Sequence, residues 1–134
     1  IVSKGGNYLL NIGPGPDGEL DAVAYQRLKE IGSWMKTNGE AIYNSRMFTV
    51  FSEGEKIRFA QSKDAKTRYI FLFDFPEDKI ALTKIPFSKT DKVQLLGNNK
   101  SLTWKQTATG VEITIPAALK SATDHVWVLK VTSN

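Results

Sequence analysis

The spacing of hydrophobic positions changes in character at residue 39 of this chain. Between residues 20 and 38, apolar side chains recur every three or four positions, which is typical of an amphipathic helix. From residue 39 onward they fall in short runs that alternate with polar residues, as half-buried β-strands do. We therefore divide the chain into residues 1–38 and residues 39–134.

One helix is expected from Asp21 to Asn38. Asp21 is the expected N-cap, and Gly39 is the expected stop at the C-terminal end. Trp34 lies beside the apolar stripe of this helix. The stripe consists of Leu20, Ala24, Leu28, Ile31 and Met35.

A short apolar run, Asn7 to Ile12, precedes the helix and predicts a strand. Glycines lie on both sides of the run, and its apolar density suits a strand that is buried on both faces, as in a parallel sheet. One strand and one helix make half of a βαβ unit, which has no stable sheet without a partner strand. We therefore expect that an N-terminal part of the polypeptide is missing, and that residues 7–12 form an edge or unpaired strand in this chain alone.

The remainder of the chain predicts an antiparallel β-sandwich. Short strand-like runs are separated by turns rich in Gly, Asn, Asp and Pro, at the spacing typical of such folds. The last run is apolar on both faces and is expected to be central. The predicted strands are Ala41–Tyr43, Phe48–Phe51, Lys56–Ser62, Thr67–Phe75, Lys79–Lys84, Lys92–Leu96, Leu102–Lys105, Gly110–Ile115 and Val126–Thr132.

Composition excludes several kinds of site. The chain is 41% hydrophobic and 24% charged, as an ordinary globular domain is, and no apolar run reaches the length of a membrane span. A net charge of +4, scattered along the chain, does not indicate nucleic acid. With no cysteine and one histidine, His125, neither a zinc cluster nor a nucleophilic triad is expected. No signal-peptide pattern is present at Ile1.

The carboxylates form no convincing catalytic pair. Asp17, Glu19 and Asp21 lie near the start of the helix, where the helix dipole favours acidic residues. Asn11 lies at the C-terminal end of the predicted strand, where α/β folds place their active sites. Asn11 is therefore the one candidate substrate-binding residue, with hydrogen bonding to neighbouring loops as the alternative.

Aromatic residues in the second part of the chain leave two interpretations open. They could build a sugar-stacking platform, but most lie at positions that alternate like core residues. Trp104 is flanked by polar residues and is the aromatic residue most expected to be exposed.

Several segments, in order along the chain, resemble the α-L-fucosidases of glycoside hydrolase family 29. The first part resembles the last barrel strand and helix of that family, and the end resembles its C-terminal β-sandwich. The matching segments are IVSKGGNYLLNIGP (1–14), RLKEIGSWM (27–35), NGEAIY (38–43), VQLLG (93–97), LTW (102–104) and VWVLK (126–130).

The resemblance implies a mostly β chain: an antiparallel β-sandwich preceded by one strand–helix unit of a (β/α)8-like barrel. It implies a retaining hydrolase of terminal α-L-fucose that uses an Asp nucleophile and a separate carboxylic acid. No residue here matches the nucleophile motif, so we carry over no catalytic, cofactor-binding or metal-binding residue.

The resemblance also shapes what we expect of partners. We expect a fucosylated glycan to bind through the missing barrel, and neither a nucleic acid nor a membrane partner. A homo-oligomer is left open, and the family resemblance favours a periplasmic or extracellular location. The alternative function is a non-catalytic carbohydrate-binding or purely structural β-sandwich.

Overall fold

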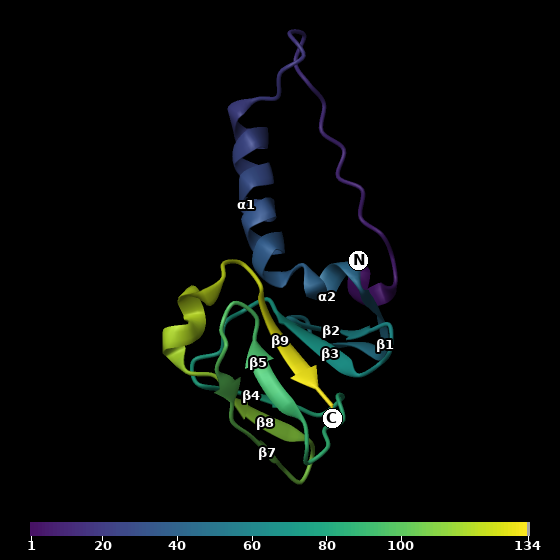
Figure 1. Ribbon diagram of the computed structural model, residues 1–134, viewed down its shortest axis with the longest axis vertical. Helices are drawn as coiled ribbons and strands as arrows, with labels where there is room; N and C mark the ends of the chain where they lie inside the picture. Colours follow the sequence, from purple (N-terminus) through teal and green to yellow (C-terminus); the bar gives the residue numbers. More distant parts are fainter. Residues whose placement is uncertain (134) are drawn as a thin grey trace.

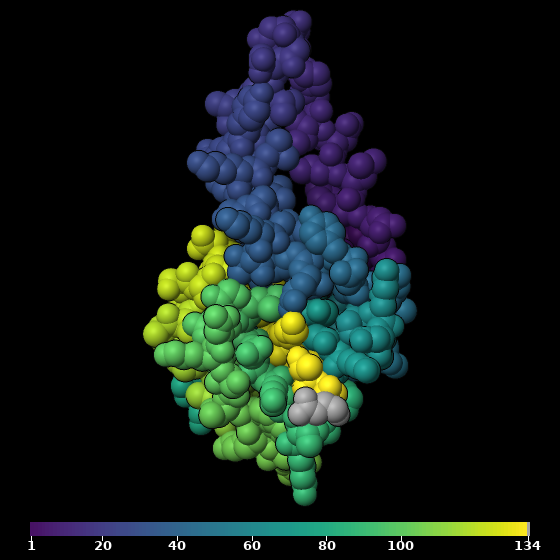
Figure 2. Space-filling model, viewed as in Figure 1, coloured from purple at the N-terminus to yellow at the C-terminus, as the bar shows by residue number. Residues whose placement is uncertain are grey.

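A long helix stands out from a β-sandwich, and an extended N-terminal segment runs beside it (Figure 1). This arrangement is seen in a computed structural model, which describes residues 1–133. The helix, α1 (Ala22–Asn38), leads into a short second helix, α2 (Glu40–Tyr43), at the sandwich. The space-filling view shows the helix and the N-terminal segment as a projection from the sandwich (Figure 2).

The start and end of α1 confirm the predicted helix. The Asp21 carboxylate accepts a hydrogen bond from the backbone N–H of Ala24 at 2.7 Å, as an N-cap does. Gly39 follows the last helical residue, and its N–H donates to the carbonyl of Met35 at 2.8 Å. A Cβ atom on Gly39 would lie 2.5 Å from that carbonyl oxygen, so only glycine fits there.

The predicted strand at Ala41–Tyr43 is wrong, because these residues belong to α2. Gly39 keeps right-handed helical angles, with φ −59° and ψ −28°, so the chain turns into a second helix rather than an extended strand. Ala41 is fully buried within this helix. A run of three apolar residues is too short for its period to separate helix from strand.

The predicted strand at residues 7–12 is also wrong as secondary structure. The segment is extended, but among residues 1–133 no strand pairs with it. Leu9 is 91% exposed and Tyr8 is 64% exposed. A strand is defined by its ladder of hydrogen bonds, so the expected lack of a partner leaves this segment without strand structure. A short 3₁₀ helix, η1 (Val2–Lys4), precedes it.

Two antiparallel sheets form the sandwich. The larger has the order β1-β2-β3-β9-β5-β6, and the smaller has the order β4-β8-β7. The last strand, β9, lies between β3 and β5, which confirms its predicted central place. The strands are β1 (Ser45–Glu53), β2 (Ile57–Ser62), β3 (Thr67–Leu72), β4 (Lys79–Leu82), β5 (Lys92–Leu95), β6 (Ser101–Leu102), β7 (Trp104–Gln106), β8 (Val111–Thr114) and β9 (Trp127–Thr132).

One predicted strand, Leu102–Lys105, is divided between the two sheets. Its start pairs with β5 in the larger sheet, and its end pairs with β8 in the smaller one. Thr103 lies at the crossing, where its carbonyl accepts a hydrogen bond from the N–H of Thr114 at 2.9 Å. A second 3₁₀ helix, η2 (Ala117–Ala122), which the pattern did not predict, connects β8 with the loop before β9.

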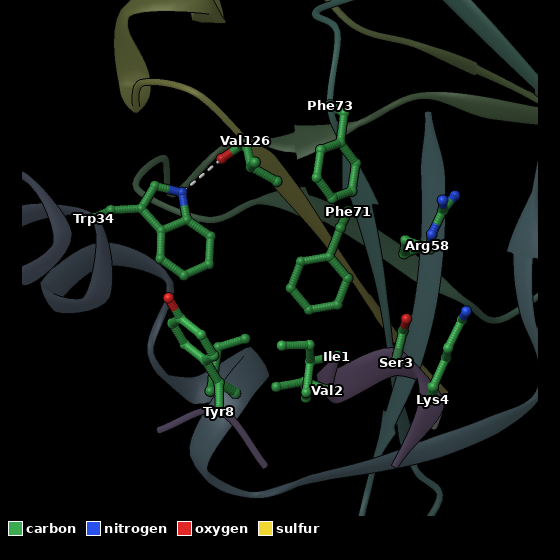
Figure 3. A pocket seen from close by; sticks show the side chains of 11 residues that line it. Ile1, Val2, Ser3, Lys4, Tyr8, Trp34, Arg58, Phe71, Phe73 and Val126 are labelled. Atoms are coloured by element: carbon green, nitrogen blue, oxygen red, sulfur yellow. Dashed lines mark hydrogen bonds between the residues drawn. The ribbon is translucent and has the colours of Figure 1, made fainter. Parts of the chain in front are cut away.

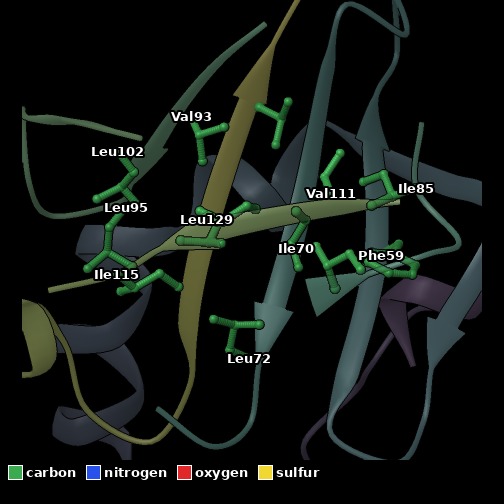
Figure 4. Close-up of a cluster of buried hydrophobic side chains, with 13 residues drawn as sticks. Phe59, Ile70, Leu72, Ile85, Val93, Leu95, Leu102, Val111, Ile115 and Leu129 are labelled. Carbon is green, nitrogen blue, oxygen red and sulfur yellow. The ribbon is translucent and has the colours of Figure 1, made fainter. Parts of the chain in front are cut away.

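The main core lies between the two sheets (Figure 4). Phe59, Ile70 and Leu129 come from the larger sheet and are fully buried against Ile113 of the smaller one. A second cluster, centred on Tyr69, Phe71 and Val128, lies on the opposite face of the larger sheet under Trp34 of α1. No helix within residues 1–133 is long and apolar enough to cross a membrane.

Candidate functional site

The acidic residues near the start of α1 have local structural partners. Asp17 accepts from the N–H of Glu19 at 3.1 Å, and the Glu19 carboxylate accepts from the hydroxyl of Tyr25 at 2.9 Å. Asp21 is the N-cap. These contacts order the turn between the extended segment and α1, and they leave no pair of carboxylates arranged for acid–base work.

Glu53 and Glu112 of the sandwich also have structural partners. The Glu53 carboxylate accepts from the backbone N–H groups of Thr83 and Lys84 at 2.9–3.2 Å. Glu112 lies 3.0 Å from Lys105 and 3.4 Å from Lys79. The residues that the structure describes contain no group of three His, Asp or Glu side chains that could hold a metal ion.

Asn11, the predicted substrate-binding residue, is exposed on the extended segment. The glycine-rich turn that follows is closed by backbone bonds: Gly15 donates to Glu19 at 2.7 Å, and Gly18 donates to Gly15 at 3.0 Å. Nothing in the described residues brings a second polar side chain into a site with Asn11. His125, the only histidine, is exposed at the end of the loop before β9.

A largely apolar groove lies where α1 and the N-terminus meet the large sheet (Figure 3). It has a volume of about 540 Å³. Phe71 and Phe73 come from β3 and the residues after it, while Ile1, Tyr8 and Trp34 line it from the N-terminal segment and α1. Such a lining is suited to packing against other apolar groups and lacks the acid and base of a hydrolytic site.

Trp34 is the main link between α1 and the sandwich. Its indole N–H donates to the carbonyl of Val126, the residue before β9, with a distance of 2.8 Å (Figure 3). One turn later the Asn38 amide donates to Thr123 at 3.2 Å, and the Asn38 side chain is fully buried. These bonds hold the C-terminal end of α1 in one orientation on the sheet.

A buried ion pair lies at the opposite end of the large sheet. Arg68 of β3 is paired with Asp91, and both side chains are almost completely shielded from solvent. Asp91 also accepts from Ser88 and from the hydroxyl of Ser133, at 2.7–2.9 Å. Burial alone raises the pKa of Asp91, but the hydrogen bonds from Ser88, Arg68 and Ser133 hold it below its ordinary value of 3.8.

Sequence reasoning did not single out Arg68 or Asp91. Arg68 has the same parity along β3 as Ile70 and Leu72, which face the core between the sheets. A charged residue on the apolar face of a strand is a signal for a buried partner. The identity of the partner, 23 residues away, has no local signal.

The tryptophans of the sandwich serve its packing. Trp104, the aromatic residue expected to be most exposed, is half-buried and stacks edge-on against Phe87 at 4.9 Å. Its indole N–H donates to the carbonyl of Asp91 at 3.1 Å. The expectation of an exposed Trp104 is therefore wrong, because the ring fills the sandwich edge instead of facing solvent. Trp127 packs against Phe75 in the same way, at 5.2 Å.

Apolar side chains remain uncovered on the projection. Val23, Leu28 and Ile31 of α1 are 37–62% exposed, and Leu9 of the extended segment is almost fully exposed. Exposed apolar surface of this kind is a mark of contact with further protein. Within the stripe predicted from the sequence, Leu28 and Ile31 face solvent, whereas Leu20, Ala24 and Met35 are half-buried.

Two family models match the chain. The model described as Alpha-L-fucosidase matches residues 1–40, and the one described as Alpha-L-fucosidase C-terminal domain matches residues 52–132. The rat tissue α-L-fucosidase is 38% identical to the chain, and the human tissue α-L-fucosidase is 33% identical. Each comparison covers 98% of this chain but 29% of the relative, so the chain spans less than a third of these relatives.

Solved structures with the same fold include two bacterial enzymes. The Thermotoga maritima α-fucosidase, in complex with a mechanism-based inhibitor, superposes with a TM-score of 0.86 at 28% identity. The α-L-fucosidase isoenzyme 1 from Paenibacillus thiaminolyticus superposes with a TM-score of 0.83, also at 28% identity. Both comparisons cover 98% of this chain and 31% of the solved chain. The similarity therefore includes the projection as well as the sandwich.

Proposed function

Because this chain belongs to the α-L-fucosidase family, we propose that it is the C-terminal part of a glycosidase that hydrolyses terminal α-L-fucose from glycoconjugates. In this role α1 and the extended segment complete a catalytic barrel, and the sandwich braces that barrel. The observation that carries the proposal is the uncovered apolar surface on both α1 and residues 8–10, beside a sandwich whose own core is closed.

The chemistry of hydrolysis is assigned to residues outside this chain. A retaining glycosidase needs two carboxyl groups about 5–5.5 Å apart, one as nucleophile and one as acid and base. Several carboxylates in the described residues instead cap turns or form ion pairs with lysine and arginine, among them Asp21, Asp91 and Glu112. The contribution of this chain is to hold the last strand and helix of the barrel in place.

Asn11 is proposed as a substrate-side residue of the complete enzyme. It lies on the extended segment, before the turn at residues 15–19 that leads into α1. In a barrel this position is the C-terminal end of a strand, where active-site loops converge. A periplasmic or extracellular location and assembly into a homo-oligomer are further proposals, which cell fractionation and light scattering would test.

The test is hydrolysis of an aryl α-L-fucoside by the complete polypeptide and by the 134-residue chain. We expect turnover with retention by the former and none by the latter. In the complete enzyme, Asn11→Ala should lower kcat/KM by about 5- to 100-fold, equivalent to about 1–3 kcal/mol, with little change in Tm. Turnover by the short chain alone, or a complete polypeptide inactive on α-fucosides but active on another glycoside, would overturn the proposal.

A further inference from the structure

A second, more polar groove lies between the C-terminal end of α1, α2, and strands β5 and β9. It has a volume of about 480 Å³ and is separate from the apolar groove beside the N-terminus. We propose that this groove is a non-catalytic site for one or two units of a neutral saccharide. The inference does not depend on the proposed hydrolase, because it concerns binding by residues of this chain.

Tyr43 provides an aromatic face at the edge of the groove. It is the last residue of α2 and is 72% exposed, so its ring is available to a ligand. Its ring lies over Gly39, where an added Cβ atom would be 3.1 Å from the ring, so the absence of a side chain at residue 39 leaves room for the ring. An aromatic ring at this edge presents a flat surface to the C–H face of a pyranose.

Amide side chains face the same groove. Gln94 of β5 and Asn98 and Asn99 of the following turn line it. The Asn98 carbonyl oxygen accepts from the N–H of Lys100 at 2.8 Å, which fixes the side chain and leaves its NH₂ group for another acceptor. Amides offer both donors and acceptors, which is what the hydroxyl groups of a sugar require.

The charges of the groove favour a neutral ligand. Lys130 of β9 is paired with Glu40 of α2 at 2.9 Å, so the two charges cancel. The other charged residue in the lining is Lys36. A phosphate or carboxylate site is expected to offer several unpaired cations, whereas one of the two lysines in this lining is already paired with a carboxylate. Glu40 is held by its lysine and has no second carboxylate in the lining, so the site binds without hydrolysing.

The test is a titration of the isotope-labelled chain followed by backbone amide NMR signals. The neutral probes are methyl α-L-fucoside, methyl β-D-galactoside and N,N′-diacetylchitobiose, and the anionic probe is N-acetylneuraminic acid. We expect saturable shifts around Tyr43, Gln94 and Asn98 with at least one neutral probe, at a Kd in the millimolar range typical of a small open site.

Variants separate a binding site from a general surface effect. Tyr43→Ala should raise the Kd about tenfold, Gln94→Ala should raise it about threefold, and Tyr43→Phe should leave it within about twofold. Tyr25→Ala, which removes a tyrosine exposed on α1 outside the groove, is the control and should change nothing. The proposal is overturned if no neutral probe shifts these signals, if only the anionic probe does, or if Tyr43→Ala binds as the parent chain does. The same spectra report whether each variant is folded.

Discussion

At the scale of single residues, the main departure from an apolar core is the buried pair of Arg68 and Asp91. The pair joins β3 to the loop before β5, and Ser133 adds the end of β9 to the same network. A buried charge is tolerated only when its partner and hydrogen bonds are present. The network thus makes three segments depend on one carboxylate.

Removing that carboxylate should be costly. We expect Asp91→Asn to lower the free energy of unfolding by about 3–5 kcal/mol, because Arg68 is left buried without its partner. Chemical denaturation measures the change. The control is Asp74→Asn, which breaks an exposed pair with Lys56 and should cost less than about 1 kcal/mol. Equal losses in the two variants would contradict a specific role for the buried pair.

The same carboxylate predicts a pH dependence. The pKa of Asp91 is lower in the folded chain than its ordinary value of 3.8. The contribution of the carboxylate to the free energy of unfolding is therefore complete above pH 3.8. As the pH falls below 3.8 the unfolded state binds the proton first, and the contribution is lost as the pH passes the folded pKa. The stability difference between the parent chain and Asp91→Asn should therefore narrow below pH 3.8. A difference that widens on acidification would contradict this assignment.

At the scale of elements, the β2–β3 hairpin contains a residue that its turn disfavours. Ala65 has a φ of +58°, in the left-handed region, and its N–H donates to the carbonyl of Ser62 at 3.0 Å. The Ser62 hydroxyl and the Asp64 carboxylate are also hydrogen-bonded within the turn, at 2.6 Å. These bonds hold the conformation despite the cost of a Cβ atom at positive φ.

Ala65→Gly should stabilise the chain. The substitution removes the cost of about 1–2 kcal/mol that a Cβ atom pays in the left-handed region. Glycine also gives the unfolded chain more conformational entropy, which offsets part of this gain, so we expect a net stabilisation of about 0.5–1 kcal/mol. Ala81→Gly, in the exposed part of β4, is the matched control and should destabilise by about 0.5–1 kcal/mol. Thermal unfolding of both variants shows whether each substitution raises or lowers the stability. A loss of stability in Ala65→Gly would contradict the turn geometry.

The junction of α1 with the sandwich gives a second prediction at this scale. Trp34→Phe removes the indole N–H and leaves the carbonyl of Val126 without its donor, so we expect a loss of about 1–2 kcal/mol. Amide hydrogen exchange should also quicken in the last turns of α1. Tyr25→Phe, which removes an exposed bond to Glu19 in the same helix, should have little effect on either measurement. Unchanged exchange in Trp34→Phe would show that packing alone holds the helix.

At the scale of the whole molecule, the sandwich and α1 differ in how completely they bury their apolar side chains. The sandwich covers its large apolar residues, with Leu129 and Ile113 at 0% exposure, whereas Leu28 and Ile31 on α1 are 37% and 46% exposed. The exposed stripe adds little to the stability of this chain and is available for self-association. This contrast fits the proposed role of α1 and the extended segment as parts of a barrel.

A double substitution of the stripe tests that contrast. Leu28→Gln with Ile31→Gln should change the free energy of unfolding by less than about 1 kcal/mol, while lowering self-association in sedimentation equilibrium. Leu129→Ala, in the closed core, should cost about 2–5 kcal/mol. A large destabilisation from the double substitution would mean that the stripe is packed within this chain.

Local patterns in the sequence were sufficient for much of the secondary structure. The helix with its Asp21 cap and the sequence positions of most strands follow from capping chemistry and from periods of 3.6 or two residues. These features depend on neighbours within a turn or a strand. The central place of β9 followed as well, because only an inner strand buries both of its faces.

Tertiary structure decided the rest, because partners far apart in sequence leave no local pattern. It divided Leu102–Lys105 between two sheets, turned Ala41–Tyr43 into α2, and left residues 7–12 extended without a ladder. The bond from Trp34 to Val126 joins residues 92 apart, and the groove beside Tyr43 combines two helices, a turn and two strands. Such contacts depend on which surfaces meet when the chain packs, and a pattern read along the chain does not contain that choice.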